Sequence, residues 1–117
     1  MLQRPAAIVL FVLAGSGGWS MPAAAQSAIK IGVIDSYTGF LAQAGDEMEK
    51  GINLYVKTHE KELPAGVKVE LIRRDDAAAP EVGKRVAQEL ITRERVQALL
   101  GIVGSPIAAA VSPLTAV

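Results

Sequence analysis

The sequence contains no cysteine and only one histidine, His59, among its 117 residues. Without cysteine the chain can form no disulfide framework, no thiolate metal site and no catalytic thiol. His59 falls on the apolar stripe of an expected helix, away from the candidate loops described below. No histidine-based triad and no histidine-rich metal site can therefore be assembled, and we expect neither a metal nor another cofactor.

An excess of charge of either sign is also missing, because 12 lysine and arginine residues are matched by 12 aspartate and glutamate residues. Nucleic-acid binders usually gather basic residues on one face, so we expect no nucleic-acid partner. The segment after residue 25 has no G-x-G-x-x-G fingerprint and no phosphate loop, which argues against a dinucleotide enzyme. Asp35, Asp75 and Asp76 invite an acid–base interpretation, but acidic residues that end strands are more often solvated or cap backbone groups.

The first 25 residues have the pattern of a cleaved secretory signal peptide. A basic residue lies near the amino terminus, an apolar run covers residues 6–14, and small residues lead to the alanines at 23–25. This pattern predicts cleavage after Ala25. A membrane anchor is the alternative, but a spanning helix needs about 20 apolar residues, and this run meets Gly15 too early. Since no cysteine follows the cleavage site, we expect no lipid anchor and a freely soluble product in the periplasm.

Hydrophobic periodicity divides residues 26–117 into alternating strands and helices. Apolar or alternating runs predict strands, three- and four-residue spacing predicts helices, and prolines and glycines mark the boundaries. The expected elements are a strand at 28–35, a loop at 36–45, a helix from Gly45 or Asp46 to before Pro64, a strand at 67–74, a helix from Pro80 to about Arg95, a strand at 97–103, and a helix from Pro106 to Val117 that Pro113 kinks or breaks. The acidic residues Asp46, Glu47 and Glu49 are expected in the first turn of the first helix.

This alternation predicts an α/β fold with a parallel sheet and helices on both of its faces. The nearly continuous apolar character of the first and third strands fits burial on both sides. With a strand order of 2-1-3, the direction in which successive strands are added to the sheet would reverse between the first and third strands. Three strands leave one sheet edge open, so residues 26–117 are expected to be an incomplete domain at the front of a longer protein.

Ligands of open parallel sheets bind beyond the carboxyl ends of the strands, which directs attention to residues 36–45 and 103–106. In the second loop, Gly104 allows close backbone approach, Ser105 is expected to cap a helix, and the helix start favours an anion such as a carboxylate. An ordinary serine cap without a ligand explains the same residues. The first loop supplies Tyr37, Thr38 and Phe40, which can form hydrogen bonds or stack on a ligand, or can simply pack on their own domain.

The ordered set of segments IKIGVIDSYTG, AQAGDEMEKGINL, VELIRRDD and AQELITRERVQALLGIVGS resembles a known family. It is similar to the amino-terminal lobe of the branched-chain amino acid type of periplasmic substrate-binding protein, the ligand-capturing component of ABC importers. The resemblance covers the whole segment after the leader. It implies the first lobe of a two-lobed clamp, truncated in this chain, that closes on a small solute and delivers it to a permease in the inner membrane.

By position, the resemblance implies that Ser105 and Gly104 hold the charged head of the ligand and that Tyr37 lies in a loop facing the cleft. Ala44 stands where amino acid binders often carry an aromatic residue, and Phe40 replaces a common proline, so amides and aromatic or aliphatic carboxylates join amino acids as expected ligands. The resemblance implies a monomeric binding protein and no enzyme. A ligand-sensing receptor domain and a secreted α/β enzyme with its active site elsewhere remain the alternatives.

Overall fold

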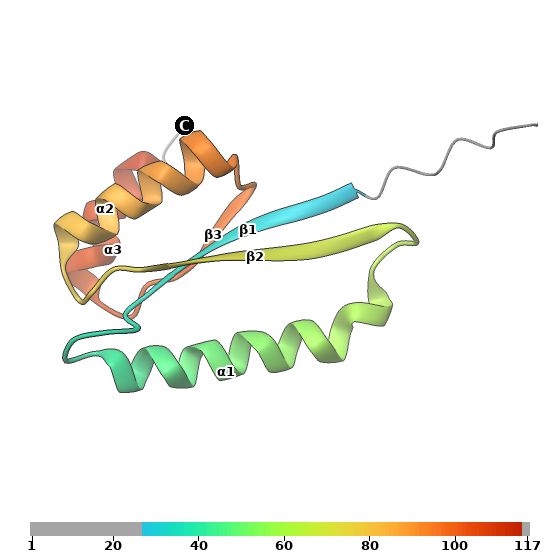
Figure 1. Cartoon of the computed structure of the whole chain (residues 1–117), viewed down its shortest axis with the longest axis horizontal. Coiled ribbons are helices and arrows are strands. Elements are labelled where there is room, and N and C mark those ends of the chain that lie inside the picture. The colour runs from blue at the N-terminus through green and yellow to red at the C-terminus, as the bar shows by residue number, and fades with distance from the viewer. Residues whose placement is uncertain (1–26, 116–117) are drawn as a thin grey trace, which may run out of the picture.

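The computed structural model describes residues 27–115, which form three parallel strands with helices on both faces of the sheet (Figure 1). The expected leader, residues 1–25, and the last two residues of the expected third helix lie outside this range. In chain order the elements are β1 (Ser27–Asp35), α1 (Ala42–His59), the 3-10 turn η1 (Glu60–Glu62), β2 (Val67–Asp75), α2 (Pro80–Glu89), the π-helical turn η2 (Leu90–Glu94), β3 (Ala98–Gly101), α3 (Ser105–Val111) and the 3-10 turn η3 (Ser112–Leu114).

The sheet has the order β2-β1-β3, which confirms the predicted 2-1-3 arrangement. Strand β1 pairs with β2 along its whole length, from Ser27 opposite Val67 to Asp35 opposite Asp75. The shorter β3 pairs with the second half of β1, and Gly101 lies opposite Ile34. Because all three strands run in the same direction, their carboxyl ends meet at one edge.

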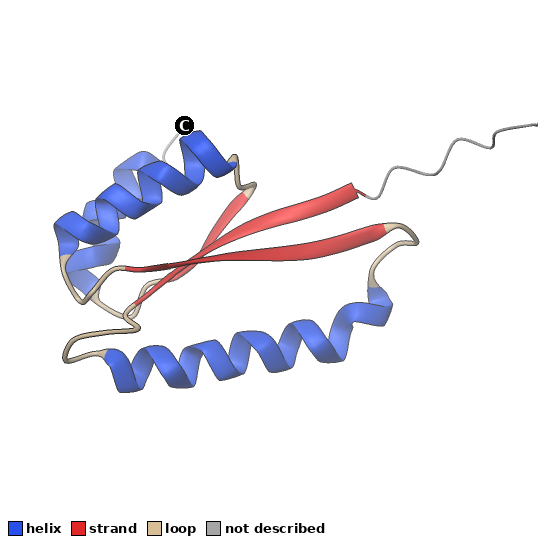
Figure 2. Cartoon of the chain, viewed as in Figure 1, coloured by secondary structure: helices blue, strands red, loops and turns tan. Residues whose placement is uncertain are grey.

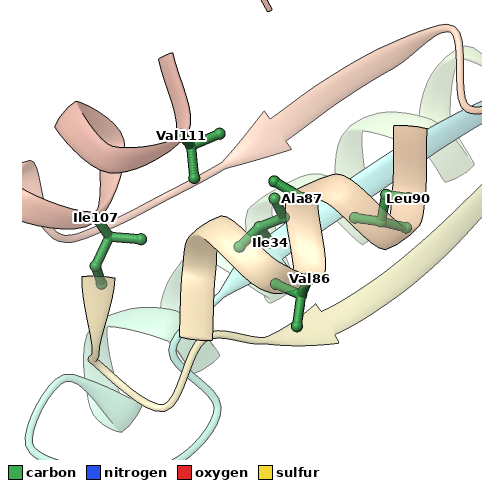
Figure 3. Packing of buried hydrophobic residues seen from close by; sticks show 6 residues of the cluster. All are labelled: Ile34, Val86, Ala87, Leu90, Ile107 and Val111. Carbon is green, nitrogen blue, oxygen red and sulfur yellow. The ribbon is translucent and has the colours of Figure 1, made fainter. Parts of the chain in front are cut away.

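The hydrophobic core lies between the sheet and the helices α2 and α3. Figure 3 shows Ile34 of β1 among side chains from both helices and from the turn η2. All of them are at most 4 % exposed, and they are Ile34, Val86, Ala87, Leu90, Ile107 and Val111. The apolar stripe read from the sequence of the second helix therefore faces the sheet, and burial of these side chains stabilises this half of the fold.

Helix α1 lies alone on the opposite face of the sheet (Figure 1). Its only buried residue is Gly45, and Leu54 and Tyr55 each remain 64 % exposed. A cavity of about 460 Å³ separates the helix from the sheet and is lined almost entirely by apolar groups: Ile31, Gly51, Ile52, Tyr55, Val56, His59, Leu63, Val69, Leu71 and Leu100. His59 is half-buried at its rim and stacks on Tyr55, with ring centroids 3.9 Å apart.

Helix α1 begins at Ala42, three residues before the earliest predicted start. Gly39 has a φ of +84° and its carbonyl accepts from the N–H of Ala42 at 3.2 Å, so the chain turns early into the helix. The prediction that three acidic residues occupy the first turn is therefore wrong, because that turn contains none.

The other boundaries fall where the backbone leaves its regular path, and the end of the second helix near Arg95 agrees with the prediction. Helix α2 gives way to the π-helical turn η2 and ends at Arg95, which is left-handed with a φ of 55°. Strand β3 ends at Gly101, two residues before the predicted end, and the next residue, Ile102, has a φ of 70°, which lies outside the strand region. Helix α3 changes to a 3-10 turn at Ser112, beside Pro113, which confirms the predicted break.

Residues 26–117 expressed alone are expected to melt without a sharp cooperative transition. The described core lies on one face of the sheet, and the apolar cavity under α1 leaves the other face poorly packed. The apolar surface buried in this segment is therefore too small to offset the conformational entropy that the chain loses on folding. Circular dichroism during heating, combined with size-exclusion chromatography, measures this, and a steep melt of a monomer would contradict the expectation.

Candidate functional site

Three loops meet at the carboxyl edge of the sheet: residues 36–41 after β1, 76–79 after β2 and 102–104 after β3 (Figure 2). The first loop contacts both others. A Cβ placed on Gly39 would lie 3.3 Å from the carbonyl oxygen of Ala77, and a Cβ on Gly104 would lie 3.4 Å from Leu41. This edge is where ligands of open parallel sheets bind, so the two loops singled out in the sequence are brought together.

Helix α3 begins at this edge with Ser105, a predicted ligand contact. The prediction that Ser105 caps the helix is wrong, because Gly104 occupies the cap position. The carbonyl oxygen of Gly104 accepts from the N–H groups of Ile107 and Ala108, each at 3.0 Å, so the cap is made by backbone. Ser105 is already helical and exposed, and within residues 27–115 its hydroxyl makes no hydrogen bond, which leaves the hydroxyl available to a ligand.

Gly104 is buried against the side chain of Ile107. A Cβ at this position would lie 2.8 Å from Ile107 Cδ1, closer than nonbonded carbon atoms approach. The absence of a side chain at Gly104 therefore lets the start of α3 sit tightly on the core. The close approach seen here is to Ile107 of the same helix, and the expected contact between Gly104 and a ligand stays a prediction.

Tyr37, the third predicted ligand contact, is half-buried and points its hydroxyl at helix α1. The phenol Oη donates to Glu49 Oε2 at 2.8 Å. Burial raises the pKa of Tyr37, and the hydrogen bond to the Glu49 carboxylate raises it further, so the phenol keeps its proton. The hydroxyl is thus engaged within the fold, while the backbone of Tyr37 lies at the loop edge.

Glu49 links three elements through its two carboxylate oxygens. In addition to Tyr37, Glu49 accepts from Arg73 Nε of β2 at 2.6 Å and from Asn53 Nδ2 of α1 at 2.7 Å. Arg73 also donates to Asn53 Oδ1 at 2.7 Å. Burial alone raises the pKa of Glu49, but the bonds from Tyr37 and Arg73 outweigh it and lower the pKa. The network fastens the first loop and α1 to the edge strand.

Asp75 joins the first and second loops. Its carboxylate accepts from the backbone N–H of Tyr37 at 3.0 Å, of Thr38 at 3.4 Å and of Ala77 at 2.8 Å, and from Thr38 Oγ1 at 2.6 Å. Desolvation raises the pKa of Asp75, but these hydrogen bonds outweigh it and the pKa is lowered. Asp75 therefore caps backbone groups, as the sequence analysis favoured.

Beside the hydrogen bonds of Asp75 lies a group of three buried polar residues, Asp35, Ser36 and Asp76. Each of them is 0 % exposed. The N–H of Ser36 donates to Asp35 Oδ1 at 2.9 Å, and Ser36 Oγ donates to Asp76 Oδ1 at 2.6 Å. Asp76 Oδ1 also accepts from the N–H of Ala78 at 2.9 Å. The two carboxyls are thus not solvated, and their part in the loops is structural rather than that of an exposed acid–base pair.

Neither a metal centre nor a membrane span is found in the part of the chain that the structure describes. Within residues 27–115, no three side chains of histidine, cysteine, aspartate or glutamate gather closely enough to hold a metal ion. None of the helices in the same range is both long and apolar enough to cross a bilayer.

Sequence reasoning found the loops and Ser105 but missed the side chains that brace them. Glu49 was expected only to favour the helix start, and Ser36 was assigned no role. The contacts that define them join residues 12 and 40 positions apart. A single sequence carries no periodic signal for such pairs. The one available hint is that Ser36 follows a buried strand directly, where a polar side chain must find a partner.

Comparison with known proteins finds similarity to a single group of proteins along nearly the whole segment that the structure describes. A family model described as periplasmic binding protein matches residues 28–117. A protein of Brucella abortus named Leu/Ile/Val-binding protein homolog 6 is 36 % identical over 109 residues, which is 92 % of this chain but 26 % of that relative. The chain therefore spans about a quarter of the length of the relatives it matches.

The solved structures that resemble this chain are also substrate-binding proteins. The solute-binding protein of an ABC transporter from Rhodopseudomonas palustris BisB5, in complex with 3,4-dihydroxybenzoic acid, is 41 % identical with a TM-score of 0.70 over 75 % of this chain and 24 % of that chain. A branched-chain amino acid transporter substrate-binding protein from Streptococcus pneumoniae, in complex with isoleucine, is 28 % identical with a TM-score of 0.68 over 73 % and 25 %. Both are binding proteins and not enzymes.

Proposed function

The chain belongs to the periplasmic binding protein family, and from that premise we propose that it forms the front part of the first lobe of an ABC importer's solute-binding component. The full-length protein would capture a small solute between two lobes and deliver it to a permease of the inner membrane. The predicted leader, residues 1–25, supports export to the periplasm, and the absence of cysteine supports a product that carries no lipid. We expect it to act as a monomer.

The observation that carries this proposal is the exposed hydroxyl of Ser105 at the loop edge of the sheet, which makes no hydrogen bond within residues 27–115. Ser105 lies at the start of α3, where the helix dipole favours negative charge. Gly104 brings the backbone close, and any contact from Tyr37 comes from its ring or backbone because its hydroxyl is held by Glu49. These features suit a carboxylate head group.

A carboxylate is also the group that the ligands of the solved relatives share. Isoleucine and 3,4-dihydroxybenzoic acid each carry one. The dihydroxybenzoate binder is 41 % identical to this chain, and the isoleucine binder is 28 % identical. By the resemblance to the family, Ala44 stands where amino acid binders often carry an aromatic residue. We therefore place aromatic carboxylates before branched-chain amino acids as the ligand class.

Thermal unfolding of the full-length protein tests the proposal. We expect 4-hydroxybenzoate, 3,4-dihydroxybenzoate or benzoate to raise the Tm, because a ligand at 100 times its Kd stabilises the bound form by about 2.7 kcal/mol. Isoleucine and leucine serve as the competing class. If neither class moves the Tm at millimolar concentration, the carboxylate assignment fails.

Ser105→Ala is expected to weaken binding of that carboxylate by about 1 to 3 kcal/mol, which is the cost of losing a hydrogen bond to a charged group. Ser112→Ala is the matched control, because Ser112 is also exposed but lies at the far end of α3. Isothermal titration calorimetry measures both affinities, and the unliganded Tm should be unchanged in each variant. Equal affinities in Ser105→Ala and the unmodified protein would remove Ser105 from the site.

A further inference from the structure

Phe40 is an aromatic residue of the first loop that the proposed function does not use. Its side chain is 85 % exposed, more than any other large apolar side chain in the part of the chain that the structure describes. The other exposed ones lie within strands and helices: Ile29 in β1, Leu54 and Tyr55 in α1, and Leu100 in β3. Phe40 therefore presents an exposed ring at the edge of the sheet where the three loops meet.

The backbone on either side of Phe40 is held in place by hydrogen bonds. Before it, the backbone N–H and the hydroxyl of Thr38 donate to the carboxylate of Asp75 at 3.4 Å and 2.6 Å. The carbonyl oxygen of Gly39 accepts from the N–H of Ala42, where α1 begins, at 3.2 Å. A ring that is carried by a fixed backbone loses little freedom when a ligand packs on it, and such preorganisation favours binding.

The two chain neighbours of Phe40 contact the other two loops. Gly39 lies against the second loop, and Leu41 lies against the third, where its Cδ1 would be 3.4 Å from a Cβ placed on Gly104. Gly104 directly precedes Ser105 in the chain. Phe40 thus lies between the contacts that join the three loops, at the same edge as the exposed hydroxyl of Ser105.

We propose that the ring of Phe40 packs against the ring of a bound aromatic carboxylate and makes the site prefer aromatic to aliphatic ligands. This inference rests on the proposed function and adds to it the residue that contacts the body of the ligand. Ser105 is suited to the charged head, whereas the body of a ligand needs an apolar or aromatic wall. Offset-stacked and edge-to-face aromatic pairs are stabilised beyond their buried area, so Phe40 gives a preference that an aliphatic side chain does not.

Isothermal titration calorimetry of the full-length protein with benzoate and cyclohexanecarboxylate tests this preference. Both ligands carry a carboxylate on a six-membered ring, but only benzoate is aromatic. Phe40→Leu keeps an apolar side chain and removes the aromatic face. We expect this variant to bind benzoate about 2- to 13-fold more weakly than the unmodified protein does, with little change in the Kd of cyclohexanecarboxylate.

Two further variants separate the contact with the ligand from general effects on the protein. Phe40→Ala also removes the apolar surface and should weaken the binding of both ligands. Leu54→Ala is the matched control, because Leu54 is likewise exposed, at 64 %, but lies in the body of α1. It should leave both Kd values unchanged. Since both side chains are largely exposed, the unliganded Tm should stay the same in every variant.

Three results would overturn the contact between Phe40 and the ligand ring, each in a different way. Unchanged benzoate affinity in both Phe40 variants, together with weaker binding in Ser105→Ala, would leave the proposed site in place and remove Phe40 from it. An equal loss for both ligands in Phe40→Leu would show that the ring acts through another part of the full-length protein. If the unmodified protein binds neither ligand, the proposed ligand class fails and the contact fails with it.

Discussion

Replacing Gly101 with alanine is expected to lower the free energy of unfolding by about 2 to 6 kcal/mol. Gly101 ends β3 with a φ of +109°, a conformation that residues with a Cβ rarely adopt. A Cβ here would also collide with the backbone carbonyl oxygen of Ile34 and lie 3.2 Å from its carbonyl carbon. Ile34 is 0 % exposed and sits in the central strand, so the backbone cannot move aside without disturbing the core.

Two other glycines show how much of the stability loss in Gly101→Ala comes from the positive φ and how much from the collision. Gly66 has a φ of +81° but open space around its Cβ position, so Gly66→Ala should cost only about 1 to 2 kcal/mol. Gly51 lies inside α1 with nothing near it, and Gly51→Ala should stabilise by about 0.5 to 1 kcal/mol. Urea unfolding of the full-length protein measures all three. A loss in Gly101→Ala no larger than that in Gly66→Ala would mean that the collision is relieved without cost.

The sheet could be predicted from the sequence because its pattern is local. The apolar run of β1, the alternation in β2 and the helical stripe of α2 each appear within ten residues, and parallel strands joined by helices leave few possible orders. The loops could not be predicted in this way. Ala77 and Ala78 both have positive φ values, of 51° and 55°, although alanine gives no sign of a left-handed conformation. Their backbone N–H groups donate to the side chains of Asp75 and Asp76, and these hydrogen bonds accompany the left-handed conformation.

The candidate site shows the same division between local and distant information. Ser105 was located because a glycine, a serine and a proline in succession mark a helix start. The cap was assigned one residue too late, since the carbonyl of Gly104 does the capping without any side chain. Tyr37 is expected from the sequence in a loop that faces the cleft, but the partner of its hydroxyl, Glu49, lies on another element. The sequence alone does not show which carboxylate accepts the hydrogen bond of the Tyr37 hydroxyl.

Asp35 and Asp75 illustrate what burial adds to sequence. They are direct partners in the register of β1 and β2 and both end a strand, so sequence reasoning treats them alike. Asp75 accepts hydrogen bonds from three backbone N–H groups and one hydroxyl, whereas the side chain of Asp35 accepts from one N–H and keeps a buried oxygen without a donor. Their pKa values consequently move in opposite directions. The same residue type therefore stabilises the edge of the sheet at one position and strains it at the other.

Replacing Asp75 with alanine is expected to destabilise the full-length protein by about 2 to 4 kcal/mol at pH 7. The carboxylate is the acceptor for Tyr37, Thr38 and Ala77, and hydrogen bonds to a charged group contribute about 1.5 to 3 kcal/mol each before water replaces them at a half-buried site. Asp46→Ala is the control, because its exposed ion pair with Lys50 should contribute less than about 1 kcal/mol. Urea unfolding compares the two variants.

The pH dependence of this stability loss shows whether it comes from the charged hydrogen bonds of Asp75 or from lost packing. The pKa of Asp75 lies below its ordinary value of 3.8, so the stabilisation by its carboxylate is present above that value and is lost as the pH falls through the lowered pKa. The stability gap between the unmodified protein and Asp75→Ala should therefore be constant from pH 5 to pH 7 and should narrow below pH 4. A gap that stays equally wide at pH 3 would show that the alanine variant loses packing and not charged hydrogen bonds.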